Sequence, residues 1–163
     1  MDAHAAALGI HVGCGSTGLL LGPVAMFSAK RRGRHTLAGE AYHWVFLVLF
    51  LSAVALAVLN WDQVWWLAPV GAFSYAFALL GYLSGKVRWR GWLRFHVAGQ
   101  GGSYIAMVTA LLVVNTGVGS PLPWLVPTLI GAPIISWVNA QVAAGKRPKR
   151  RSGRVASSRI AGQ

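Results

Sequence analysis

Residues 30–50, KRRGRHTLAGEAYHWVFLVLF, run from a cluster of basic residues directly into an uninterrupted apolar segment. The stretch crosses that boundary with two histidines, a tyrosine and a glutamate, which are His35, His43, Tyr42 and Glu40. A basic cluster followed by a long apolar segment is typical of the cytoplasmic edge of a transmembrane helix. This stretch therefore predicts that the chain enters a lipid bilayer near residue 41.

The composition also predicts a membrane protein. The chain has 163 residues, enough for one domain, of which 55% are hydrophobic and 11% are charged, and its mean hydropathy is +0.53. An average soluble domain carries about 25% charged residues. A chain this short cannot bury so much apolar surface in a core, so we expect lipid to cover the rest. The single cysteine, Cys14, excludes an internal disulfide.

Five apolar segments approach or exceed the roughly 20 residues that a helix needs to cross the bilayer. They lie at approximately 7–28, 41–60, 64–84, 95–116 and 122–142. Each must be helical, because lipid offers no partner to unpaired backbone groups. The sequence thus predicts an all-α bundle of five transmembrane helices within residues 1–144, and a basic, disordered tail at 145–163. Asp2, in place of a basic n-region, argues against a secretory signal peptide.

The basic residues, which give a net charge of +12, fall in three clusters, at 30–34, 86–94 and 146–159. Five spans put all three clusters on the same side of the membrane, and an excess of Lys and Arg marks the cytoplasmic side. We therefore expect a multi-pass protein of the cell (inner) membrane with its N-terminus outside and its C-terminus inside. Topology already explains the charge, so anionic lipid at the inner face is the expected partner and nucleic acid is not.

Three histidines and one carboxylate gather near the predicted inner boundary. His35, Glu40 and His43 lie around the start of the second span, and His96 lies at the start of the fourth. Both spans run outward, so His43 and His96 are expected at the same depth. Imidazole and carboxylate groups bind zinc, iron, manganese or copper, and two facing histidines suit haem b. The predicted metal ligands are all four residues, and the predicted haem ligands are His43 and His96.

A simpler explanation needs no ligand. Histidines at a membrane boundary can cap helix ends and contact lipid phosphate. In the first turn of the second span, Glu40 would favour the helix N-terminus, and it could pair with a nearby arginine. The chain has no HExxH or CxxC motif and no nucleophilic constellation. A proton-relay or substrate-contact role for these histidines stays open, and so does whether the chain is an enzyme.

Polar residues deeper in the spans are expected to face the bundle interior rather than lipid. His96, Gln100 and Ser103 share one face of the fourth span, and Tyr104 lies near its middle. His11, in the first span, lies too far from the inner histidines to join them, so it is predicted to be a separate outer site or a packing residue.

Two further features complete the list of candidates. Asn139 lies near the inner end of the fifth span. Gly15, Gly18 and Gly22 share one face of the first span, which allows close approach of another helix. That helix could belong to this chain, to a partner protein or to a second copy in a homo-oligomer.

Residues 11–44, HVGCGSTGLLLGPVAMFSAKRRGRHTLAGEAYHW, resemble the start of the DUF2306 family of small polytopic bacterial membrane proteins. The matching positions are His11, Gly15, Gly22, Pro23, Lys30, His35, Gly39 and Tyr42. The later stretches HVAGQGGSYIAMVTALLVVN and PLPWLVPTLIGAPI are similar to the second half of related multi-span proteins. The resemblance implies a polytopic bacterial membrane protein whose histidines act as a set. It implies no particular activity.

The leading functional hypothesis is an inner-leaflet His/Glu layer that binds haem or a metal ion, in electron transfer. Two alternatives stay open. One is an accessory or structural membrane subunit whose glycine faces dock a partner. The other is a small transporter that uses the polar line of His96, Gln100 and Ser103.

Overall fold

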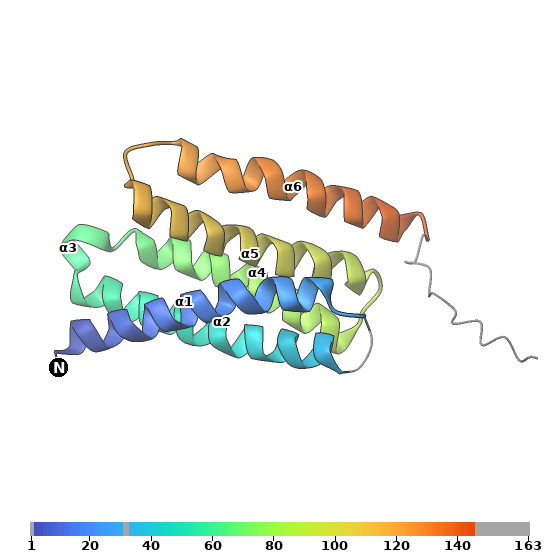
Figure 1. Cartoon of the computed structure of the whole chain (residues 1–163), viewed down its shortest axis with the longest axis horizontal. Coiled ribbons are helices and arrows are strands. Elements are labelled where there is room, and N and C mark those ends of the chain that lie inside the picture. The colour runs from blue at the N-terminus through green and yellow to red at the C-terminus, as the bar shows by residue number, and fades with distance from the viewer. Residues whose placement is uncertain (1, 31–32, 146–163) are drawn as a thin grey trace, which may run out of the picture.

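The computed structural model describes residues 2–30 and 33–145, and within them the chain is helical without any strand (Figure 1). The predicted tail lies outside the described residues from position 146 onward. The helices are α1 (Ala3–Phe27), α2 (Arg34–Leu59), α3 (Trp61–Val64), α4 (Leu67–Val87), α5 (Trp92–Thr116) and α6 (Leu122–Ala143).

The five long helices confirm the predicted all-α bundle. Each is long and apolar enough to cross a membrane, whereas α3 is a single turn between α2 and α4. At the basic loops, α2, α4 and α5 extend beyond the predicted apolar segments, whereas α1 ends at Phe27, close to the predicted residue 28. In particular, α2 begins at Arg34 instead of residue 41, and α4 continues to Val87. Hydropathy detects only the part of a helix that lies in lipid, whereas basic residues continue a helix readily.

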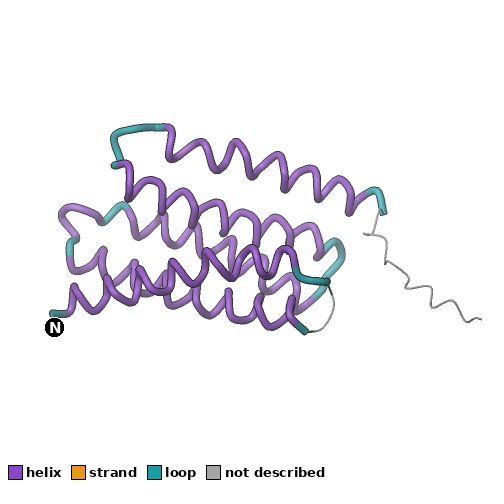
Figure 2. The backbone as a smooth tube through the Cα atoms, in the orientation of Figure 1, coloured by secondary structure: helices purple, strands orange, loops and turns teal. Residues whose placement is uncertain are grey.

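The long helices lie roughly antiparallel, side by side (Figures 1 and 2). Contacts join α1 to α2, α2 to α4 and α4 to α5, with a smaller contact between α1 and α5, and α6 packs on α5 at the edge. The loops after α1 and α4 and the end of α6 meet at one end, to the right in Figure 1. This end carries residues 30, 34 and 86–94, and we call it the basic end.

The buried core is small. Its central cluster comprises Tyr42, Phe46, Leu49, Ala78 and Met107. Many large apolar side chains point outward instead; Phe27 on α1, for example, is 89% exposed. An apolar exterior around a small core is what a bundle surrounded by lipid requires.

Glycines allow the helices to approach closely. On α1, a Cβ at Gly18 would lie 2.8 Å from Met107 Cε, and one at Gly22 would lie 2.5 Å from the Tyr104 ring. The predicted glycine face of the first span is therefore occupied by other helices of the same chain. Those glycines do not form a free docking surface for a partner.

Candidate functional site

The four predicted ligands all lie toward the basic end, but their contacts divide them into two groups. His35 meets His96, whereas Glu40 and His43 face α4. In the part of the chain that the structure describes, no three His, Cys, Asp or Glu side chains gather closely enough to hold a metal ion. The predicted set of four ligands does not form, because equal depth does not give side chains the same direction around their helices.

The histidine pair, His35 and His96, joins the start of α2 to the start of α5. The ring centroids are 6.1 Å apart and the ring planes meet at 78°. His35 Nδ1 lies 2.8 Å from the carbonyl oxygen of Ala25, and His96 Nδ1 lies 2.7 Å from that of Gly81. A carbonyl only accepts, so each Nδ1 carries the proton and each Nε2 carries a lone pair. Neither Nε2 has a hydrogen-bond partner among residues 2–30 and 33–145.

The surroundings of the pair are partly cationic. Lys30 Nζ donates to Ala25 O at 3.1 Å, so the same carbonyl accepts hydrogen bonds from both Lys30 and His35. Partial removal from solvent lowers the pKa of the Lys30 ammonium group, which lies in the loop after α1. On α4, a Cβ at Gly85 would lie 3.1 Å from His96 Nδ1, so this glycine leaves room for the imidazole.

The second group, which we call the glutamate cluster, consists of Glu40 and His43 on α2 with Tyr82 and Lys86 on α4. Tyr82 OH donates to Glu40 Oε2 at 3.0 Å, and Lys86 Nζ forms an ion pair with Glu40 Oε1. The Lys86 ammonium also lies 5.2 Å from the centroid of the Tyr82 ring. The carboxylate therefore ties α2 to α4.

This arrangement corrects the role that the sequence suggested for Glu40. Because α2 begins at Arg34, Glu40 lies in the second turn, and the first turn contains no acidic residue. The prediction that Glu40 stabilises the helix N-terminus from the first turn is wrong. Its charge is paired, as expected, but by Lys86 of another helix rather than by an arginine.

His43 lies one turn further along α2 and is only 5% exposed. Its ring stacks on Tyr82 with centroids 3.8 Å apart and planes 6° apart, and Tyr75 lies 6.1 Å away at 28°. His43 Nδ1 is buried and has no hydrogen-bond partner among the described residues. Sequence reasoning missed Tyr75, Tyr82 and Lys86. Their spacing of seven and four residues, which places them on one face of α4, could have revealed them.

The polar line predicted on α5 is used in contacts between helices. Ser103 Oγ lies 3.0 Å from Tyr42 OH, and Gln100 Nε2 donates to Ala78 O at 3.4 Å. Tyr104 OH donates to Leu19 O at 3.3 Å. These groups connect α5 to α2, α4 and α1, and Ser103 is fully buried.

The other two candidates lie apart from both groups. His11 Nδ1 lies 3.2 Å from Ser52 Oγ, which itself donates to Leu49 O. His11 therefore packs α1 against α2. This contact agrees with its predicted role as a packing residue. Asn139 Oδ1 is buried without a partner in the described part of the chain, on the edge helix α6.

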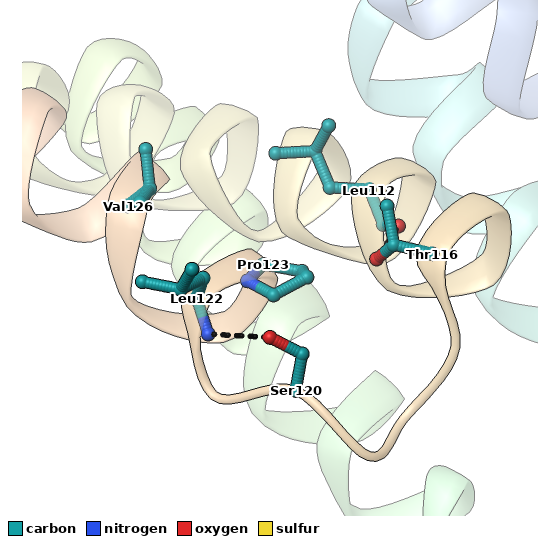
Figure 3. Close-up of a pocket in the computed structure, with 6 residues that line it drawn as sticks. All are labelled: Leu112, Thr116, Ser120, Leu122, Pro123 and Val126. Carbon is teal, nitrogen blue, oxygen red and sulfur yellow. Dashed lines mark hydrogen bonds between the residues drawn. The ribbon is translucent and has the colours of Figure 1, made fainter.

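An open surface pocket of about 280 Å³ lies at the opposite end of the bundle, between the end of α5 and the start of α6 (Figure 3). Its lining is almost entirely apolar and comprises Leu112, Thr116, Ser120, Leu122, Pro123 and Val126. None of the candidate polar residues contributes to this lining, so it is separate from the histidine pair and the glutamate cluster.

Comparison with known proteins adds no relative. No family model matches the chain, and no curated protein or solved structure matches it either. The resemblance to the DUF2306 family stays a prediction, and the functional argument rests on the residues themselves.

Proposed function

We propose that this chain is a multi-pass cell-membrane protein that binds a transition-metal ion through His35 and His96. The observation that carries the proposal is the matched geometry of the two imidazoles. They come from different helices, their centroids are 6.1 Å apart, and each donates its Nδ1–H to a backbone carbonyl. A metal-bound histidine almost always donates its other ring N–H to a carbonyl, a carboxylate or water, which fixes the ring and its tautomer.

The separation of the rings suits a shared ion. Metal–nitrogen bonds to imidazole are about 2.0–2.1 Å long, so a ring centre lies roughly 3 Å from the ion it binds. Two rings whose centres are 6.1 Å apart can therefore reach one ion between them. Zinc, copper and iron favour imidazole, and water or phosphate oxygens would complete the coordination. A redox-active ion would make the protein an electron carrier. Zinc would instead stabilise the contact between the starts of α2 and α5.

The haem hypothesis for His43 and His96 has less support. His43 stacks face to face on Tyr82, and His96 bonds the carbonyl of Gly81 on the preceding long helix, α4. Each is thus held against α4 by contacts of its own. The transporter hypothesis also loses support, because Gln100 and Ser103 already bond neighbouring helices. An accessory subunit is compatible with a metal site and would be recognised by a copurifying partner.

We further propose that the basic end faces the cytoplasm. The charge asymmetry of the loops supports this orientation. At this end the guanidinium carbon of Arg88 lies 5.3 Å from the centroid of the Trp92 ring, and Trp89 packs on Phe95. Basic side chains interleaved with indoles suit the headgroup region of an anionic leaflet.

The test is direct metal binding by the full chain in mild detergent. We would record absorption spectra before and after dithionite, measure bound metals, and titrate the metal-free protein with Co²⁺ and Zn²⁺. We expect binding of one ion per chain, weakened at least about tenfold in His35→Ala and in His96→Ala, since each substitution removes a ligand. His11→Ala is the matched control, because His11 is also partly buried but bonds Ser52 far from the pair.

Equal binding by wild type and both variants would exclude the pair as the site. A Soret band that shifts on reduction and is lost in His43→Ala would instead support a haem.

A further inference from the structure

The glutamate cluster contains the only glutamate of a chain that has 15 basic residues and 3 acidic ones. The other two acids, Asp2 and Asp62, lie at the far end, before α1 and in α3. Glu40 and Lys86 are partly open to the surroundings, with side-chain exposures of 29% and 51%. A charged group from the basic end can therefore reach the cluster.

His43 is the buried member of the glutamate cluster. It is nine-tenths buried, and its Nδ1 has no hydrogen-bond partner among the described residues. A buried polar nitrogen without a partner is costly, and its presence calls for an explanation. Glu40 lies three residues earlier on α2, so it projects from the same face of the helix as His43.

We propose that the glutamate cluster is a proton-binding site at which His43 takes up a proton from the basic end. The imidazolium is stabilised by the Glu40 carboxylate, which then divides its charge between His43 and Lys86. The titratable or charged side chains that face His43 are Glu40 on α2 and Tyr75, Tyr82 and Lys86 on α4. Of the titratable groups on α1, His11 bonds Ser52 instead, and Cys14 packs against the apolar core cluster.

The site is closed toward the middle of the bundle. Beyond His43, Phe46 and Phe50 of α2 pack on Tyr75, the latter with ring planes 1° apart at 5.1 Å. The next polar bridge along α2 is Ser52 with His11. An apolar segment separates the two, so a proton that enters at Glu40 stops at His43. The cluster binds a proton without conducting it across the bundle.

The consequence is a contact between α2 and α4 that depends on pH. In the neutral state Glu40 pairs with Lys86 alone. In the protonated state His43 carries a second cation against the same carboxylate and against the face of Tyr82, which also favours a cation. This proposal does not require a metal and stands if the histidine pair binds none.

The experiment is a pH titration of the full chain in lipid nanodiscs with ¹⁵N-labelled histidine, followed by NMR. The His43 signal is assigned by its loss in His43→Gln. We expect this signal to shift with pH, as that of an imidazole that takes up a proton does. Glu40→Gln should move the midpoint to lower pH and Lys86→Met to higher pH, each by at least about half a unit, or threefold in proton affinity.

Lys30→Met is the matched control, because it removes the same charge at the same end but beside His35. It should leave the His43 midpoint in place. Tyr82→Phe keeps the stacked ring and removes only the hydroxyl bond to Glu40, so a smaller shift is expected. A His43 signal that stays constant from pH 4.5 to 9, or a midpoint that Glu40→Gln and Lys86→Met both leave unchanged, would overturn the proposal.

Discussion

Gly99 of α5 lies directly against the backbone of Gly81 on α4. A Cβ built on Gly99 would lie 2.4 Å from Gly81 N and 2.6 Å from Phe77 O. The carbonyl of the same Gly81 accepts the bond from His96 Nδ1. The contact that brings α4 and α5 together thus also sets the position of one member of the histidine pair.

Gly99→Ala is expected to destabilise the bundle by about 1–3 kcal/mol, because the added methyl group must displace backbone rather than a flexible side chain. Thermal unfolding in detergent, followed by circular dichroism, measures the change. Gly39→Ala is the matched control, since a Cβ there meets no atom within 4 Å. In a helix interior this control should be neutral or stabilising by up to about 1 kcal/mol. Equal effects of the two substitutions would contradict the packing at Gly99.

Lys30→Met is expected to tighten Co²⁺ binding by the histidine pair several-fold. The ammonium group bonds the same carbonyl as His35, and its positive charge opposes a cation at the pair. The measurement is a spectroscopic Co²⁺ titration, with Lys86→Met as a control that removes an equal charge paired to Glu40. If Lys30→Met weakened Co²⁺ binding instead, the site would depend on an anion such as a lipid phosphate.

The buried bond between Tyr42 and Ser103 should contribute measurably to stability. Ser103→Ala leaves the Tyr42 hydroxyl unpaired in the core, which costs about 1–3 kcal/mol, whereas Tyr42→Phe leaves Ser103 bonded to Gln100 O and costs about 1 kcal/mol. Ser74→Ala is the control, because the Ser74 hydroxyl returns to Val70 O of its own helix. Unfolding midpoints that fail to separate Ser103→Ala from Ser74→Ala would refute this contribution.

The proposed orientation predicts which loops a membrane-impermeant thiol reagent can reach. In a Cys14→Ser background, Val118→Cys, in the loop before α6, should react in intact cells. Arg90→Cys, in the loop after α4, should react only after the membrane is opened. The reverse pattern would place the basic end outside.

The bundle itself could be predicted from the sequence, because every segment that crosses lipid must be both apolar and helical. Residue counts along the spans also predicted that the candidate ligands lie toward the basic end of the bundle. Their directions could not, because each residue turns about 100° around a helix and the sequence does not name the neighbouring helices. Hence His35 meets His96, while His43, the predicted partner of His96, turns toward Tyr82.

Glu40 shows a second limit of prediction from sequence, which is that the partner of a charged residue cannot be identified. Its partner Lys86 belongs to a different basic cluster, 46 positions away. In the sequence Lys86 is indistinguishable from a topology signal, and it acquires a specific role only because α4 continues one turn past its apolar segment.

The position of α6 at the edge bears on how the protein is made. Since α6 packs on α5, the contacts among α1, α2, α4 and α5 involve no residue beyond Thr116. They do not require α6 and can therefore form before it docks. α6 then docks on a completed surface, where Gly101 of α5 receives Ile135 and Gly131 of α6 receives Ile105. A chain that ended after residue 120 would therefore still contain every helix that brings His35 and His96 together.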